Sequence, residues 1–427
     1  MTHSESNNQK EVSTAYRNFV LVMLTLVYVF NFIDRQLLVI LQESIKKELS
    51  LSDTQLGMLS GLTFALFYVT VGIPIARWAD KGNRRNIVAM SLGLWSIMTG
   101  LSGMARNFIH LLLARVGVGV GEAGGSPPAH AMISDYFPPG KRATALAFYS
   151  TGIYFGMLIG FLMGGYLNQQ LGWRTAFYVL GIPGVLFSLL FYLFVKEPRR
   201  GATDVSRSET EHSFMEVVKI LFSKPTFMFL SMATALHVFC IYGILNWAPS
   251  FLARLHGMNN KEIGVALGLI LGGTGAVGSF FGGVVTDHFG KTNKQMYTRI
   301  PAWLILGSIP FVFGALYLES NAASLFCFGV VNFLYSTYLG PSINVAHSLV
   351  PAQLRALTSA ILFFVLNLIG LGFGPLVVGM ISDLLKETYG NESLRYAMTG
   401  VVVVSITAVI LFLASAKKLP GDLRSVE

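Results

Sequence analysis

Four charged side chains stand in otherwise apolar stretches, and they are the residues best suited to chemistry. Asp34 and Arg35 lie in the first hydrophobic segment, and Arg115 and Glu122 lie in residues 108–128, FIHLLLARVGVGVGEAGGSPP. We expect residues 108–128 to form one helix. Seven residues make almost two α-helical turns, so Arg115 and Glu122 should leave the same helix face, about 10 Å apart along its axis. An ionised side chain inside a bilayer is costly unless it is paired or faces water.

Carboxylates beside guanidinium groups in an apolar site can control a proton. Burial raises the affinity of a carboxylate for a proton, and a nearby guanidinium lowers it again. Arginine itself keeps its proton. We therefore expect Asp34 or Glu122 to carry a proton and Arg115 to set when it is released; the residue types leave open which carboxylate titrates. Arg35 and Arg115 could also receive an anionic headgroup, bidentately for a phosphate, with Glu122 close to the substrate. The alternative is a purely structural ion network.

The composition indicates the elements that must position these residues. Hydrophobic residues make up 53% of the chain and charged residues only 12%, about half the share typical of soluble proteins. Two cysteines in apolar runs predict no disulfide framework. The first apolar run is long and lacks a cleavage site, so we expect it to stay as a membrane helix. Twelve apolar segments are long enough to span a bilayer, and the sequence predicts an all-α membrane protein with twelve transmembrane helices.

The distribution of Lys and Arg predicts the orientation. Of the 31 Lys and Arg residues, 21 lie in the termini and the loops on the same side, and 8 lie in the opposite loops. Since cytoplasmic loops carry the excess of positive charge, both termini should be cytoplasmic. The net charge of +9 is therefore a sign of topology and gives no support to a nucleic-acid partner.

One long charged loop divides the chain into two halves. We predict an N-terminal six-helix bundle over residues 1–195, a cytoplasmic linker over 196–222, and a C-terminal six-helix bundle over 223–427. The end of the linker, residues 214–222, reads FMEVVKILF and could form an amphipathic helix on the membrane surface. A solvated loop that runs into helix seven is the alternative.

The two halves repeat each other. ARWADKGNRR at residues 76–85 corresponds to GVVTDHFGK at 283–291, and PPGKRA at 138–143 corresponds to PAQLRA at 351–356. Glycines recur at intervals of four in helix five and cluster in helix eleven, which indicates close helix packing. A duplicated six-helix unit in the same orientation is the parallel repeat of a transporter fold, with substrate bound between the halves at mid-membrane.

The repeated loops hold the candidate gating residues. A cytoplasmic carboxylate there could cap a helix or pair with a base of the other half, and so latch one conformation. The plainer interpretation is that these charges only set the topology. The candidate gating residues are Asp80, Lys81, Arg84, Arg85, Arg142, Asp287 and Arg355.

The C-terminal half has no comparable charges inside its apolar segments. Its polar and aromatic residues instead suggest an amphipathic surface for a substrate, whereas the first half would couple protons. Packing is the common role of such aromatic residues. The candidate substrate contacts in this half are Tyr242, Asn246, Trp247, Asn332, Tyr335 and Asn367.

These motifs resemble those of the major facilitator superfamily over essentially the whole chain. The Asp80 loop resembles the family's signature between helices two and three, although Ala76 replaces its leading glycine; the Asp287 loop matches better. Helix five resembles the antiporter motif, with Phe161 in place of the usual proline. Within the superfamily, NFIDRQ (31–36), ARVGVGVGEAG (114–124) and ISDYFPP (133–139) are similar to the Spinster-like lipid transporters. The resemblance implies proton-coupled movement of lysophospholipids or sphingoid phosphates.

The main functional hypothesis is a proton-coupled secondary transporter that works by alternating access on a lysolipid-like amphiphile. A drug or organic-anion transporter of the same fold is the alternative, and a membrane lipid receptor or enzyme is a third class. No nucleotide-binding loop, metal-binding pair or nucleophile motif supports an enzyme. We expect no cofactor and no metal, and partners limited to the substrate, protons and the lipid bilayer, with a functional monomer. The expected location is the cell membrane, or the inner membrane of a bacterium, as a multi-pass protein.

Overall fold

The structure is a computed structural model that describes residues 13–200 and 214–424. Every regular element in these residues is helical. Nine helical runs among them are long and apolar enough to cross a membrane. The two longest runs each turn back on themselves, and α4 (Arg84–Ser102) is a further crossing, so the fold has twelve membrane-spanning helices. The predicted all-α class is confirmed.

The first half contains six crossings. α7 (Pro139–Phe194) supplies two of them, because its backbone leaves the helical region at Gly172, where φ is 81°. That value is in the left-handed region that glycine adopts without strain. The other elements of this half are α1 (Thr14–Leu49), α2 (Asp53–Gly57), η1 (Met58–Leu62), α3 (Thr63–Lys81), α4, α5 (Phe108–Glu122) and α6 (Ser126–Tyr136).

The second half repeats this order. Its elements are α9 (Pro225–Leu245), α10 (Ala248–Leu255), α11 (Asn260–Leu269), η2 (Ile270–Thr274), α12 (Gly275–Gly290), α13 (Met296–Tyr317), α14 (Asn321–Tyr335), α15 (Leu339–Ser348), η3 (Ala352–Leu354), α16 (Arg355–Leu366), η4 (Asn367–Phe373), α17 (Gly374–Tyr389), η5 (Gly390–Glu392) and α18 (Ser393–Arg424). The short helix α8 (Phe214–Phe222) precedes it.

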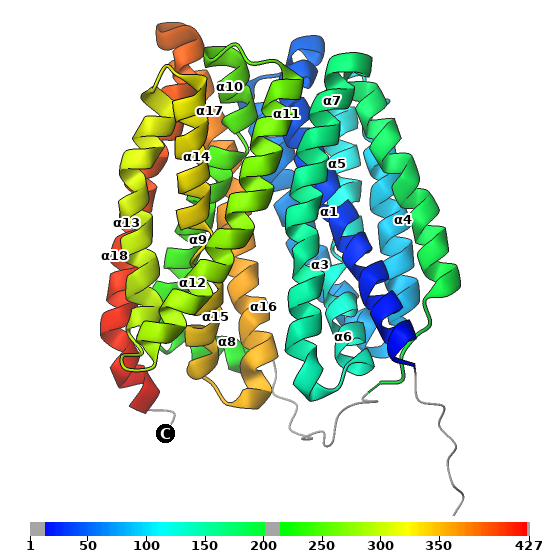
Figure 1. Cartoon of the computed structure of the whole chain (residues 1–427), viewed down its shortest axis with the longest axis vertical. Coiled ribbons are helices and arrows are strands. Elements are labelled where there is room, and N and C mark those ends of the chain that lie inside the picture. Colours follow the sequence, from blue (N-terminus) through cyan, green and yellow to red (C-terminus); the bar gives the residue numbers. More distant parts are fainter. Residues whose placement is uncertain (1–12, 201–213, 425–427) are drawn as a thin grey trace, which may run out of the picture.

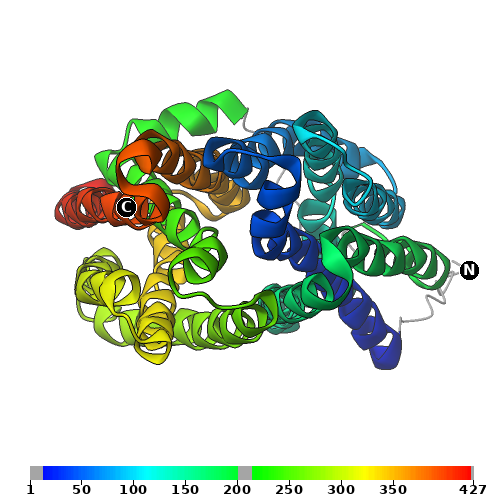
Figure 2. The ribbon, with the colours of Figure 1, turned by 90° about the horizontal axis from the view of Figure 1, so that it is seen from above.

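The two halves lie side by side, one coloured from blue to green and the other from a brighter green through yellow to red (Figures 1 and 2). α1 begins and α18 ends at the lower end of Figure 1, which we call the terminal face. The opposite end, where α10 and α17 lie, we call the distal face. Residues 201–213 of the predicted linker lie outside the described residues. The predicted domain boundaries therefore stay predictions.

The helix that carries Arg115 and Glu122 is shorter than the sequence suggested. We expected one helix through residue 128, but α5 ends at Glu122 and α6 begins at Ser126. The physical reason is local: two glycines precede Ser126, and prolines occupy the first turn of α6, where they lack an N–H that could continue the earlier helix. The break leaves Glu122 at a helix end.

The glycines of α5 make room for a neighbouring helix. A Cβ atom added at Gly121 would lie 2.8 Å from the backbone nitrogen of Trp95, and one at Gly117 would lie 2.7 Å from the sulfur of Met98. Both neighbours belong to α4, so this small-residue face lets α4 approach closely, as predicted. Trp95 is fully buried as a result.

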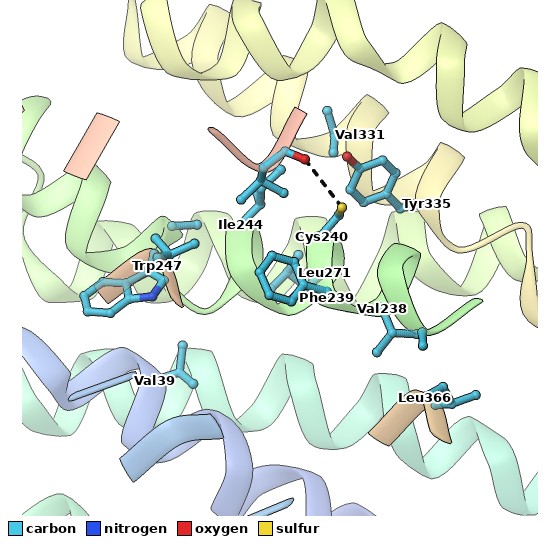
Figure 3. Close-up of a cluster of buried hydrophobic side chains, with 14 of the residues drawn as sticks. Val39, Val238, Phe239, Cys240, Ile244, Trp247, Leu271, Val331, Tyr335 and Leu366 are labelled. Atoms are coloured by element: carbon cyan, nitrogen blue, oxygen red, sulfur yellow. Dashed lines mark hydrogen bonds between the residues drawn. The ribbon is translucent and has the colours of Figure 1, made fainter. Parts of the chain in front are cut away.

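The halves share one hydrophobic core towards the distal face. It contains Val39 and Leu41 of α1 together with Phe239 of α9 and Trp247. Figure 3 shows part of this core, with Val39 lying across from Phe239 and Trp247. A second core belongs mainly to the first half and includes Trp95. Apolar contact between the halves is therefore extensive away from the terminal face.

Candidate functional site

We call Asp34, Arg35, Arg115 and Glu122 the central cluster. Within it, Arg35 and Glu122 form an ion pair. Arg35 Nε donates a 2.7 Å hydrogen bond to Glu122 Oε2, and the two residues come from α1 and the end of α5. The Glu122 side chain is completely buried, whereas the Arg35 side chain is 14% exposed. The guanidinium therefore compensates a buried carboxylate and still reaches a surface that a ligand could contact.

Aromatic rings surround the Arg35 guanidinium. Its central carbon lies 5.1 Å from the ring centroid of Phe32, 4.7 Å from that of Phe64 and 5.1 Å from that of Tyr68. Cations are attracted to ring faces at these distances, and arginine also stacks on them. α1 and α3 thus hold a planar cation in a largely apolar setting.

Arg115 is buried beside the same cluster and forms no ion pair with any residue that the structure describes. Its Nε donates to the backbone oxygen of Leu59 at 3.3 Å, and its guanidinium carbon lies 5.3 Å from the ring centroid of Phe64. Leu59 belongs to the π-helical turn η1, and such turns often occur at functional sites. Arg115 and Arg35 therefore meet at Phe64.

Asp34 is the least satisfied of the four charged residues. It is 2% exposed, and neither of its carboxylate oxygens has a hydrogen-bond partner among the described residues. The Thr99 hydroxyl is likewise buried without such a partner. Glu122 Oε1 and Asn31 Oδ1 also lack partners. A buried carboxylate without partners is costly as an anion, so Asp34 remains the candidate proton carrier that the sequence suggested.

Tyr242 is the predicted substrate contact that the second half brings to this cluster. It packs against the core of the first half, the cluster that also contains Phe64 and contacts Tyr68, the two rings beside Arg35. The seam between the halves therefore passes through the Arg35 site, where the sequence repeat predicted a substrate.

The other predicted contacts of the second half lie elsewhere. Asn246 and Trp247 follow α9; the Asn246 backbone oxygen accepts from Gln42, and Trp247 Nε1 donates to the Pro375 oxygen at 2.9 Å. Each of the remaining three has its own setting: Asn332 donates to Thr274, Tyr335 pairs with Ser405 and is fully buried, and Asn367 begins η4 and is partly exposed.

Two candidate gating residues pair within their own half. Arg84 is buried, and it contacts Asp135 at 2.6 Å and Glu197 at 2.8 Å. Glu197 also accepts from the backbone N–H of Arg85 at 2.7 Å, and the Arg85 guanidinium lies over the Tyr192 ring. These contacts tie the start of α4 to α6 and to the end of α7.

The remaining candidate gating residues lie on the terminal face. Asp80 and Lys81 are exposed, and Asp80 forms no ion pair within residues 13–200 and 214–424. Asp287 accepts from the Tyr297 hydroxyl at 3.0 Å, Arg142 donates to the Phe137 oxygen, and Arg355 is exposed. The gating hypothesis remains a prediction.

Polar contacts join the two halves at the distal face. Arg254 donates to Asp53 through Nη1 at 2.8 Å and Nη2 at 2.7 Å, and to Glu43 through Nε at 2.9 Å. Lys46 also pairs with Asp53. Asp383 accepts from the backbone N–H groups of Asp53 and Thr54, at 3.0 and 2.7 Å. The distal face is therefore closed by charge-assisted hydrogen bonds between the halves.

Sequence reasoning missed the partners that complete these clusters. Phe32 lies three residues before Arg35 on α1, and this helical spacing was the available signal for its ring beside the guanidinium. Glu197 and Asp135 could not be assigned to Arg84, since they lie 113 and 51 residues away. Asp53 and Arg254 are separated by 201 residues, and each looked like an ordinary loop charge.

A twelve-helix repeat with charges buried at the seam between its halves is the architecture of a secondary transporter. The model of the Major Facilitator Superfamily matches residues 24–375, and the chain belongs to this family. It is a multi-pass membrane transporter and not an enzyme.

The relatives and solved structures agree with the predicted Spinster resemblance. An MFS-type efflux pump of Mycolicibacterium smegmatis is 34% identical over 92% of each chain. The sphingosine-1-phosphate transporter SPNS2 of Danio rerio is 26% identical over 91% of this chain and 82% of its own. The crystal structure of a bacterial homologue of the human lysosomal transporter Spinster, in an inward-facing and unoccupied conformation, is 32% identical. It superposes with a TM-score of 0.89 over 96% of this chain and 99% of that one.

Proposed function

We propose that this protein is a proton-coupled transporter of a lysophospholipid or sphingoid-phosphate-like amphiphile. The observation that carries the proposal is that one buried cluster contains two carboxylates in different surroundings. Glu122 is bound by Arg35, whereas Asp34 has no geometric partner. The ion pair stabilises an anionic Glu122, whereas Asp34 lacks a comparable ion pair, so we infer that Asp34 is the acid that exchanges the proton.

The same cluster supports an anionic and partly apolar substrate. Arg35 has a planar donor fork that matches a phosphate, and aromatic rings surround it. A phosphate that binds Arg35 competes with Glu122 for the guanidinium. Substrate binding would then leave Glu122 without its partner and favour protonation of a carboxylate in the cluster. This exchange links substrate and proton through one side chain.

The closed distal face and the ion-pair-free Asp80 favour an inward-facing state for this conformation, with the terminal face cytoplasmic. The Lys and Arg excess on that face supports the same orientation. Alternating access would then require the Asp53–Arg254 contacts to break and the terminal face to close.

A drug or organic-anion exporter is the second candidate, and the 34% identity to an efflux pump favours it. Both candidates use the same proton chemistry and differ in the ligand at Arg35. A panel of lysolipids, sphingoid phosphates and organic anions, compared by thermal stabilisation of the purified protein, separates them, because a bound ligand stabilises the folded state by mass action.

The deciding experiment replaces Asp34 by asparagine, which mimics a permanently protonated acid. Uptake of a lysophospholipid by proteoliposomes is measured with and without an imposed pH gradient. Asp34→Asn should abolish accumulation driven by the gradient and leave counterflow, since the apolar contacts and Arg35 remain. Glu319→Gln, at an exposed carboxylate outside the cluster, is the matched control. Full gradient-driven accumulation by Asp34→Asn would move the proton to Glu122.

A further inference from the structure

A cavity of about 780 Å³ lies at the distal face, next to the contacts that join the two halves there. Its walls come from both halves and include Lys46, Lys47 and Asp53 from the first and Arg254 and Lys386 from the second. We call it the distal vestibule. Its volume lies within the roughly 300–1,000 Å³ usual for small-molecule sites. It is separate from the Arg35 cluster, and none of the residues considered so far as substrate contacts lines it.

The charges of the vestibule do not balance. Four of its lining residues are cations, Lys46, Lys47, Arg254 and Lys386, and two are anions, Glu43 and Asp53. Both anions are already engaged, Glu43 by Arg254 and Asp53 by Arg254 and Lys46. The excess positive charge therefore belongs to the two remaining lysines.

Lys47 and Lys386 are exposed, and their ammonium groups form no ion pair, hydrogen bond or cation–π contact with any described residue. Each lies in the last turn of its helix, α1 and α17 respectively. A helix C-terminus favours a cation, which by itself would explain a lysine at either place. It does not explain why both lysines line one hollow from opposite halves.

The other lining groups suit an oxyanion. Ser50, Asn259 and Asn391 add hydroxyl and amide donors, while Leu51 and Met258 add apolar surface. A phosphate monoester has several acceptor oxygens, and it can bind two ammonium groups and neutral donors together. A carboxylate has fewer oxygens to share between two lysines on different helices.

We propose that the distal vestibule binds a phosphate-type anion, the headgroup of a lysolipid phosphate or free phosphate itself. The lipid source rests on the proposed function, whereas the anion site does not. Lys47 belongs to the first half and Lys386 to the second, so the anion bridges them. A ligand stabilises the state to which it binds best, so an occupied vestibule favours the closed distal face.

The test uses the purified full-length protein and three probes: inorganic phosphate, glycerol 1-phosphate and a lysophosphatidic acid. Affinities are measured by calorimetry for the wild type and for Lys47→Ala/Lys386→Ala. The control Lys417→Ala/Lys418→Ala removes the same charge from two exposed lysines of α18, near the terminal face. Loss of two exposed charge contacts should weaken phosphate-probe binding roughly fivefold or more in the vestibule variant only. The affinity should also fall as salt rises.

Each outcome decides between the possibilities. If the vestibule variant loses affinity only for the lysophosphatidic acid, the site binds a headgroup together with its chain. If it loses affinity for all three probes, the site binds the phosphate group itself. Equal affinities in the wild type and the vestibule variant would overturn the site, as would an equal loss in the control. The Asp34→Asn protein should keep vestibule binding. Coupled flux with no lysine-dependent binding would therefore refute this inference alone, and the reverse would refute the proposed function alone.

Discussion

At the scale of residues, the proposed function requires an exchange of partners in the central cluster. Arg35 holds Glu122 through one hydrogen bond, and three rings keep the guanidinium in place. Asp34, the next residue towards the N-terminus, is buried but has no such support. Adjacent residues on one helix thus meet different surroundings, because successive side chains leave a helix about 100° apart. That difference separates the acid from the anion.

A double-mutant cycle tests the Arg35–Glu122 pair. Arg35→Ala leaves Glu122 buried without its partner, which should cost about 3–5 kcal/mol of stability. Arg35→Ala/Glu122→Gln removes the orphaned charge and should recover part of that loss. The measurement is the apparent melting temperature in detergent, with Glu122→Gln alone as the reference. A double variant no more stable than Arg35→Ala would show that the pair is not coupled.

At the scale of elements, glycines and short charged contacts decide how the helices meet. Gly165 of α7 and Gly264 of α11 lie against each other across the halves, so that a Cβ at Gly165 would lie 2.9 Å from the Gly264 Cα. The distal ends of α1, α2, α10 and α17 are joined by ion pairs and hydrogen bonds. The halves are therefore held together by close backbone packing at Gly165 and Gly264 and by charged contacts at the distal face.

Asp53→Asn should loosen the distal face. The substitution removes the charge that binds Arg254 and Lys46 and leaves Arg254 only Glu43 as an ionic partner. Spin labels at Gln170 and Thr388, exposed positions on opposite halves, report the opening by electron–electron distance measurements. We expect a longer and broader distance distribution than in the wild type. Glu387→Gln changes an exposed carboxylate nearby and should leave the distances as they are; unchanged distances in Asp53→Asn would remove its role in closure.

At the scale of the whole molecule, the distal and terminal faces differ in the contacts between the two halves. Polar contacts close the distal face, and the exposed Asp80 and Asp287 lie at the terminal face without an ion pair to the other half among the described residues. In the proposed function, such an arrangement corresponds to one of the two end states of alternating access. The proposed function therefore predicts that opening one face or the other changes the access of water to the Arg35 cluster.

The orientation of the molecule is tested by labelling in intact cells. In a variant that lacks Cys240 and Cys327, a cysteine at Lys418 on the terminal face should resist impermeant thiol reagents, and one at Glu319 should react. Both positions are exposed, so protein burial does not explain a difference. Permeabilised cells, in which both should react, serve as the control. Labelling at Lys418 only would invert the proposed topology.

The sequence alone determined the features that depend on neighbours along the chain. The apolar runs, the repeated Asp80 and Asp287 loops and the small-residue face of α5 all follow from composition and helical spacing. Four charges inside apolar segments likewise identified the central site. Even locally, the break after Glu122 was missed, although two glycines followed by Ser-Pro-Pro could have indicated it.

Only the tertiary structure decided which of these charges meet. Glu122 binds Arg35, 87 residues away, although Arg115 shares its helix face in sequence. Arg84 is buried with Asp135 and Glu197, and Arg254 closes the distal face on Asp53. The physical reason is that helical spacing fixes the direction of a side chain from its own axis, whereas its partner depends on the rotation and distance of neighbouring helices. Those are set by packing across the whole bundle.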